Sequence, residues 1–275
     1  MRKTAAAGLA VGIIAAFGLA MPASAATASN AQLSVLHGIP DTPVDVWVNG
    51  ERTLDDFAPG TLAGPLPLPA GDYVVVITAP DAADTSAPVL GPATVSLAAG
   101  GNYTAVAYLN EAGAPALKAF ANDTSKTAAG QGRLTVRHVA AAPAVDILAG
   151  GSPVIEGLTN PNESTLNLPA STVSAAVALA GTTAPVLGPT DVQIQDGVLT
   201  IVYAWGSAED GNLALAVQTV TGLHSTPGGV PSGTAGYLAE RDNITTAGIL
   251  GAGALVITLA VGSVIAVRAR KATQR

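Results

Sequence analysis

The sequence predicts an all-β protein that consists of two tandem immunoglobulin-like antiparallel β-sandwich domains and one C-terminal transmembrane helix. Three observations lead to this prediction. One pattern occurs twice, about a hundred residues apart, and both copies consist of short β-branched segments between Gly, Pro, Asn and Asp. A long uncharged run also lies near the carboxyl end.

The duplication is visible in four blocks that keep their order and their spacing. The first block, LSVLHGIPDTPVDVWVNG at 33–50, corresponds to LTVRHVAAAPAVDILAGG at 134–151. A later block, APVLGP, occurs identically in both copies. The blocks of the first copy begin at Leu33, Leu66, Ala87 and Asn102, and those of the second begin at Leu134, Leu166, Ala184 and Val198. We therefore predict domains at 31–122 and 133–220, joined by a polar linker at 123–132.

The strands expected in the first copy are short and closely spaced. They are Leu33–His37, Val44–Val48, a short strand near Arg52–Phe57, Tyr73–Thr78, Ala93–Leu97, Tyr103–Leu109 and Ala116–Phe120. Frequent turns favour antiparallel pairing in a sandwich. A parallel sheet would need helices between its strands, and no stretch shows a helical apolar period. Four prolines are expected to stop further pairing at the edges: Pro40, Pro43, Pro88 and Pro92.

The amino end has the pattern of a secretory signal peptide. Arg2 and Lys3 precede an apolar run, which is followed by Ala23, Ser24 and Ala25. A charged start, an apolar centre and a small-x-small site predict that residues 1–25 are removed by cleavage after Ala25. The alternative is an uncleaved membrane anchor.

The carboxyl end has the pattern of a single membrane span. The uncharged run at 247–267 would form a helix about 31 Å long, close to the thickness of the hydrocarbon core. The basic residues beyond it, which hold the tail at 268–275 in the cytoplasm, are Arg268, Arg270, Lys271 and Arg275. The segment at 221–243 is rich in Gly, Pro, Ser and Thr and is interpreted as a tether. The alternative for 247–267 is a buried helix of a soluble protein.

Charge and cysteine content exclude some classes of function. Residues 26–243 contain six Lys and Arg but nineteen Asp and Glu, so their net charge is −13. Such a surface repels nucleic acid and anionic lipid. The chain has no Cys, so each copy must be stabilised by its own hydrophobic core without disulfides.

A His and an Asp recur at the same distance in both copies, as His37 with Asp45 and His138 with Asp146. Alternation along a strand places His37 on the same apolar face as Leu33, and Asp45 on the opposite face from its valine neighbours. We interpret these four residues as structural. Each His would end the first strand and bond a backbone carbonyl, and each Asp would cap the loop that precedes it.

A ligand or metal site at these four residues is the alternative. One His and one Asp per copy provide fewer ligands than zinc or calcium requires, so no metal and no cofactor is predicted. The sequence contains neither H-E-x-x-H nor G-x-S-x-G. The acidic pairs Asp55–Asp56 and Glu209–Asp210 lie in turn-like surroundings. The chain is therefore not predicted to be an enzyme.

The two opening motifs resemble the start of the bacterial family catalogued as domain of unknown function 4397. That start is a strand ending in His, a loop with Pro and Asp, a Val-Asp-Val and a turn Gly. The residues that carry the resemblance are Val35, His37, Pro40, Asp41, Val44, Asp45, Val46 and Gly50, then Val136, His138, Pro143, Val145, Asp146, Ile147 and Gly151. The second copy departs from the pattern at Ala142, which replaces the loop acid. The resemblance implies an extracytoplasmic β-rich domain, often in tandem, and no assigned activity.

These observations together lead us to expect a membrane-anchored binding or structural module on the surface of a bacterial envelope. The expected location is the cell membrane, with the N-terminus outside, the C-terminus cytoplasmic and one C-terminal span. An envelope polysaccharide or a surface protein is the expected partner, and nucleic acid is not. One alternative is an envelope-polymer hydrolase with an unrecognised site. The other is a sortase-type wall-anchored protein, for which the candidate stretch is 238–242.

Overall fold

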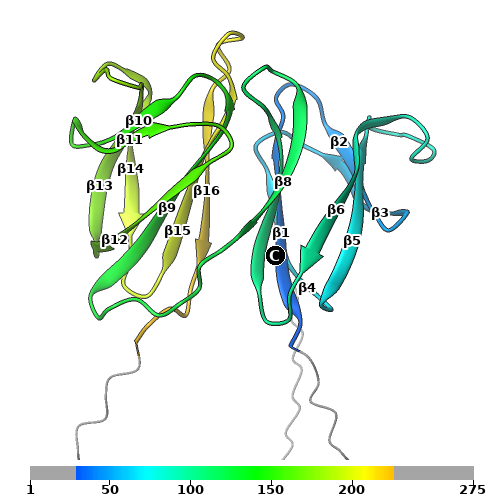
Figure 1. The fold of residues 1–275 in the computed structure, drawn as a ribbon, viewed down its shortest axis with the longest axis horizontal. Coiled ribbons are helices and arrows are strands. Elements are labelled where there is room, and N and C mark those ends of the chain that lie inside the picture. Colours follow the sequence, from blue (N-terminus) through cyan, green and yellow to red (C-terminus); the bar gives the residue numbers. More distant parts are fainter. Residues whose placement is uncertain (1–28, 226–275) are drawn as a thin grey trace, which may run out of the picture. The chain divides into compact units, whose positions relative to one another are not determined.

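The computed structural model describes residues 29–225, which are all-β (Figure 1). This confirms the predicted class for that range. In these residues no helix occurs that could cross a membrane. The predicted signal peptide with Ala25, the span at 247–267 and the basic residues Arg268, Arg270, Lys271 and Arg275 lie outside the described residues.

Sixteen strands form two series of eight. The first series is β1 (Ala31–Gly38), β2 (Val44–Val48), β3 (Glu51–Phe57), β4 (Leu62–Leu68), β5 (Gly71–Thr78), β6 (Pro88–Leu97), β7 (Asn102–Leu109) and β8 (Pro115–Ala121). The second series is β9 (Gln131–Ala141), β10 (Val145–Ala149), β11 (Ser152–Leu158), β12 (Glu163–Pro169), β13 (Ser171–Leu179), β14 (Pro185–Ile194), β15 (Leu199–Ser207) and β16 (Ala214–Val220).

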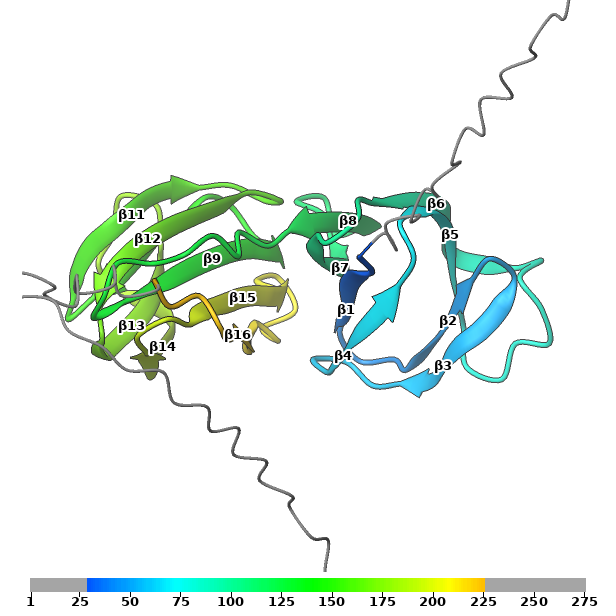
Figure 2. The same cartoon turned by 90° about the horizontal axis from the view of Figure 1, so that it is seen from below.

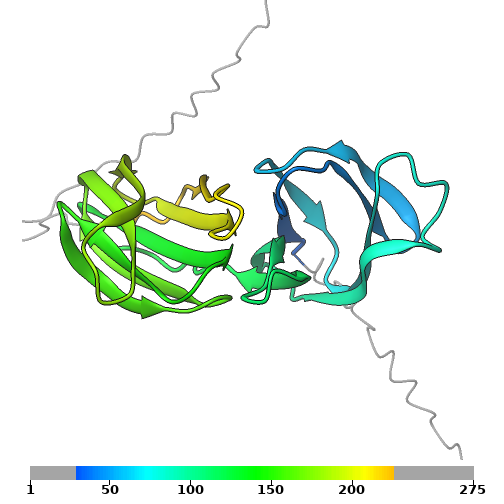
Figure 3. The ribbon, with the colours of Figure 1, turned by 90° about the horizontal axis from the view of Figure 1, so that it is seen from above.

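Each series forms two four-stranded sheets in the same order. In the first repeat, defined here as the strands β1 to β8, the sheets are β4-β1-β7-β8 and β3-β2-β5-β6. In the second repeat, β9 to β16, they are β12-β9-β15-β16 and β11-β10-β13-β14. The two sheets of each repeat face one another (Figures 2 and 3). Their facing apolar side chains form one core in each repeat.

One pairing in each repeat differs from the antiparallel prediction. β1 pairs with β7 in parallel, and β9 pairs with β15 in parallel. A parallel pair needs a long crossover, which is usually a helix. Here the intervening strands supply it, because the chain runs through the opposite sheet before it returns. The parallel pairing was not predicted because no helix that could serve as a crossover is visible in the sequence.

The edge strands β4 and β6 also differ from the prediction. β4 was not predicted, and β6 starts at Pro88 instead of Ala93. Proline is tolerated at a sheet edge because no neighbouring strand needs its missing N–H. In β4, β6 and β14 a Gly-Pro pair lies where the register shifts, so two residues face one partner residue in a bulge.

Those bulges account for the identical APVLGP blocks. Gly91 and Gly188 have positive φ values of 99° and 82°. A Cβ on Gly91 would lie 2.7 Å from the carbonyl oxygen of Val75, and one on Gly188 would lie 2.8 Å from that of Ala175. A side chain is therefore excluded both by conformation and by contact with the backbone of the neighbouring strand.

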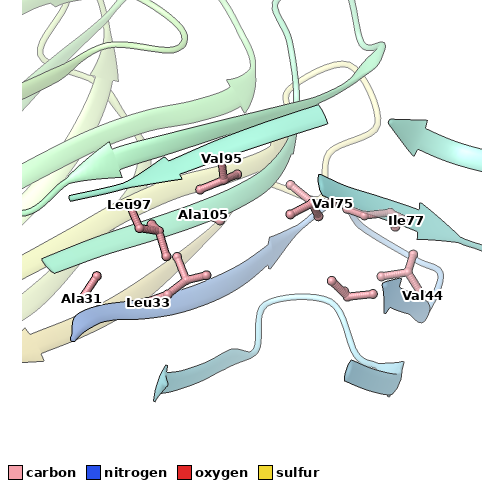
Figure 4. Packing of buried hydrophobic residues seen from close by; sticks show 10 residues of the cluster. Ala31, Leu33, Val44, Val75, Ile77, Val95, Leu97 and Ala105 are labelled. Atoms are coloured by element: carbon pink, nitrogen blue, oxygen red, sulfur yellow. The ribbon is translucent and has the colours of Figure 1, made fainter. Parts of the chain in front are cut away.

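Alternate residues of the same strands enter different cores. In the first repeat Leu33 of β1 lies in the core between its own sheets, which Figure 4 shows with Val75, Val95 and Ala105. A third cluster contains residues of both repeats. Its buried members are Leu36, Val106, Tyr108, Phe120, Val139, Leu199, Ile201, Tyr203 and Leu223. The central strands β7 and β15 are consequently buried on both faces, which explains their nearly continuous apolar sequences.

The packed structure extends past two expected boundaries. β9 begins at Gln131, inside the predicted linker, and Thr127 of that linker is buried. Leu223 lies in the predicted tether, but it is buried and its N–H donates to the carbonyl of Gly197. Thr127 also forms a bridge with His224. The linker and residues 221–225, the described start of the predicted tether, are therefore fastened to the second repeat.

Candidate functional site

The two repeated histidines hold the loops that follow their strands. Nε2 of His37 donates to the carbonyl of Thr42 at 2.9 Å, and Nε2 of His138 donates to that of Pro143 at 3.0 Å. Nδ1 of His138 accepts a long bond from the N–H of Ala140, at 3.4 Å. Both rings are buried, and burial lowers the pKa of both, against the opposing effect of their backbone hydrogen bonds. Both histidines are therefore neutral at pH 7.

The two repeated aspartates lie opposite β-bulges. Asp45 is fully buried, and the pairing of β2 with β3 shifts at its position. Its Oδ1 accepts from the N–H of Asp56 at 3.0 Å, and its Oδ2 accepts from Nη1 of Arg52 at 3.2 Å. Asp146 occupies the same place in β10, where it accepts from the N–H groups of Gly157 and Gly181, each at 2.7 Å.

These partners differ from the expected capping of the preceding loop. The carboxylates bond backbone eleven residues downstream, at Asp56 and Gly157. Both of these residues have positive φ, 48° and 64°. A bulge leaves an N–H without a strand partner, and the buried carboxylate accepts it. The fixed distance between strand and bulge therefore requires the same Asp in both copies.

The predicted site residues do not form a metal centre in the range that the structure describes. Within residues 29–225 no three side chains among His, Asp and Glu lie close enough to hold a metal ion. Each His bonds its own loop, and each Asp bonds its own bulge. Of the acidic pairs, Asp55 forms an ion pair with Arg52 at 2.9 Å, and Glu209 and Asp210 lie exposed in the turn between β15 and β16.

An open apolar pocket lies beside His138 at one end of the second repeat. Its volume is about 410 Å³. The residues that line it include His138, Ala140, Val177, Leu179, Val186 and Leu213. Leu179 and Val186 are 39% and 41% exposed, so the pocket opens to solvent between them. His138 is the only titratable side chain in the lining, and its bonds to Pro143 and Ala140 occupy both ring nitrogens.

The first repeat fills the corresponding place with its own side chains. Counting from the paired histidines, Ile39 corresponds to Ala140, and the strand registers make Ile77 the counterpart of Val177. Ile39 packs on the core of the first repeat, and Phe57 stacks on His37. The second repeat therefore has a much smaller side chain, Ala140, at the position where the first repeat packs Ile39 on its core.

A buried arginine that the sequence analysis passed over joins the two repeats. Arg137 is 1% exposed and donates from Nε to Glu163 at 2.7 Å. It also donates to the hydroxyl of Tyr203 at 2.9 Å and to Oδ1 of Asn122, in the first repeat's final segment, at 2.8 Å. Its guanidinium lies over the rings of Phe120 and Tyr203. An Arg inside the apolar stretch LTVRHVA could have indicated this buried polar contact, because a buried charge needs partners.

Polar side chains continue this network across the contact between the repeats. Gln218 accepts from the hydroxyls of Tyr203 and Thr104, at 2.6 and 2.9 Å, and donates to Ser34 at 3.1 Å. Thr104 in turn accepts from Asn122 at 3.0 Å. Because these buried groups are satisfied by one another, the network fixes how the sheets of the two repeats meet.

One protein family matches part of the chain. Residues 31–148 match the family described as Domain of unknown function (DUF4397). The matched segment contains the first repeat and continues through Leu148 in β10. This finding confirms the resemblance seen in the opening motif. No curated protein matches the chain.

Proposed function

We propose that this chain, part of which matches that family of unknown function, is a binding module anchored in a bacterial membrane and displayed outside the cell. The proposed role is binding without catalysis. The observation that carries it is the open apolar pocket of the second repeat. Pockets of this size and lining are characteristic of ligand and side-chain recognition.

The position of the pocket within the second repeat supports display away from the membrane. The pocket lies where β9 and β15 end, near His138 and Ala204. The chain leaves the repeat at the opposite end, where Leu223 bonds Gly197 just before β15. At about 3.3 Å per residue, a nine-residue strand separates these two ends by roughly 30 Å.

The finer architecture forms part of this proposal. The repeats are two immunoglobulin-like sandwich domains, the signal peptide ends at Ala25, and the span at 247–267 leaves Arg268 and the basic residues after it in the cytoplasm. The acidic composition of the exported part supports a protein or polysaccharide partner over nucleic acid. No observation favours the hydrolase or wall-anchoring alternatives.

The test is retention of purified 26–243 on isolated envelope polysaccharide, peptidoglycan and membrane-surface proteins. The wild-type fragment is compared with Ala140→Ile, which introduces the residue of the first repeat and fills the pocket. We expect one of these materials to retain the wild type and to release the variant. Retention of neither fragment by any material would contradict a binding role, and equal retention of both would place binding elsewhere.

A further inference from the structure

The chemistry around the pocket identifies its partner more narrowly. Glu209 and Asp210 are exposed and stand in the turn that supplies Ala208 and Gly211 to the pocket wall. In the same turn, Asn212 donates to the carboxylate of Asp41 at 3.2 Å. The negative charge of Glu111 also acts on His138 in the lining. The rim is therefore acidic, and no Lys or Arg belongs to the lining.

The lining excludes several classes of occupant. A sugar is bound by aromatic rings and by polar groups that converge on its hydroxyls, and this lining contains neither, since His138 is engaged with its own loop. Fatty acids and anionic lipid headgroups would place their negative charge beside the carboxylates of the rim. A ligand that carries a positive charge next to an aliphatic group would complement both the acidic rim and the apolar wall of the pocket.

The first repeat shows which aliphatic group fits. At the position equivalent to Ala140 the first repeat has the branched side chain of Ile39, which packs against a core that includes Val44 and Ile77, the counterparts of Val145 and Val177 in the pocket lining. In the second repeat, Ala140 leaves that volume empty and the exposed Val186 and Leu179 stand at its mouth. A side chain of the size of Leu or Ile, entering from outside, would restore the packing that the first repeat makes internally.

We propose that this pocket binds a partner polypeptide through a branched aliphatic side chain that is flanked by Lys or Arg. The aliphatic group enters between Val186 and Leu179, and the basic groups lie against Glu209 and Asp210. This inference rests on the proposed function, because it names the partner class for the same pocket and selects a surface protein over a polysaccharide.

The experiment uses methyl NMR of the 26–243 fragment, which contains all sixteen strands and all hydrophobic clusters of the described range. The probe is acetyl-Lys-Leu-Lys-amide. Its comparisons are the same peptide with Ala in the centre, the peptide with Glu in place of both Lys, and octanoate. We expect the Leu peptide to shift the methyl signals of Val186 and Leu179, and to bind about tenfold or more tightly than the Ala peptide, because the Leu buries more apolar surface. Added salt should weaken binding.

Two variants and one control locate the effect. Ala140→Ile fills the pocket, and Val186→Thr makes its exposed mouth more polar without changing a buried position. Both should lose most of the shift. Val154→Thr, which places the first repeat's residue at an exposed site outside the lining, should retain it. Thermal unfolding confirms that each variant is folded.

Three results would overturn the proposal: no shift of the pocket methyls, equal shifts in a folded Val186→Thr variant, or tighter binding of octanoate or the Glu peptide. These outcomes are separate from failure of the proposed function. Envelope retention that depends on Ala140 but occurs without peptide binding would keep the binding role and reject this partner. Peptide binding without envelope retention would keep the partner class and reject the envelope as the source of the partner.

Discussion

At the scale of single residues, the repeated His and Asp are explained by the backbone that each one serves. His37 and His138 bond the loops after β1 and β9, while Asp45 and Asp146 accept the N–H groups that bulges leave open. The sequence revealed which residues recur. It did not reveal the bulges, because the partner of each Asp lies on the next strand and becomes its neighbour only after pairing.

We expect Asp45→Ala and Asp146→Ala each to lower the free energy of unfolding by roughly 1–3 kcal/mol, because buried N–H groups lose their acceptor. The loss should be larger for Asp146, since both of its acceptors serve backbone N–H groups, whereas half-exposed Arg52 can turn to water. Chemical denaturation measures the difference, with Thr53→Ser on exposed β3 as control. Wild-type stability in both Ala variants would contradict the bulge account.

The buried histidines also predict how stability depends on pH. Burial lowers the folded-state pKa of His37 and His138 below the ordinary value of 6.5, so below that pH the unfolded chain binds more protons. The stability that these groups contribute is therefore present above about pH 6.5 and is lost as the pH falls toward the folded-state values. Unfolding at about pH 7.5 and about pH 5.5 measures the slope, and the double variant His37→Gln/His138→Gln should flatten it. An unchanged slope would show that other groups are responsible.

At the scale of the element, the strands in which β-branched residues alternate were predictable, and the proline-rich edges were not. β2, β5 and β7 lie close to their expected places. β4 was missed because Pro65 and Pro67 indicate a loop when a strand is assumed to have neighbours on both sides. The Gly-Pro of APVLGP was recognised as repeated, but its bulge depends on backbone contact with β5 or β13, which local sequence does not encode.

The bulge predicts unequal effects of two similar substitutions. Gly188→Ala and Gly150→Ala both place a side chain at positive φ, which costs about 1–2 kcal/mol. Gly188→Ala should destabilise the protein further, because its Cβ would meet the carbonyl oxygen of Ala175, whereas nothing lies near a Cβ at Gly150. Denaturant unfolding compares the two variants. Equal losses would argue against the close approach in β14.

At the scale of the whole molecule, the sequence predicted neither the Arg137 network that joins the repeats nor the pocket that distinguishes them. Both were missed for the same reason. Alignment of the two copies reveals only the residues that they share. Arg137 corresponds to Leu36, and the pocket results from differences such as Ala140 against Ile39. The contacts between the repeats and the open pocket therefore depend on positions where the two copies differ. Comparison of the shared residues does not reveal such positions.

The shared cluster predicts that residues 29–225 unfold as one unit. Arg137→Ala leaves Asn122 and Tyr203 without a buried donor, and we expect a loss of roughly 3–5 kcal/mol. Arg137→Met, which keeps the apolar stem, should lose less. Calorimetry of the 26–243 fragment should show one transition. Two transitions, with only one of them shifted by Arg137→Ala, would show that the repeats unfold independently.

Labelling of single cysteines on intact cells tests the central claim, outward display of the pocket, most directly. The chain has no Cys, so Val186→Cys at the pocket mouth and Thr273→Cys near the carboxyl end can be introduced separately into the full chain. With a membrane-impermeant maleimide, we expect Val186→Cys to be labelled on intact cells and Thr273→Cys to be labelled only after lysis. Labelling of Thr273→Cys on intact cells, or protection of Val186→Cys until lysis, would contradict the proposed topology and with it the role of the pocket as an external binding site.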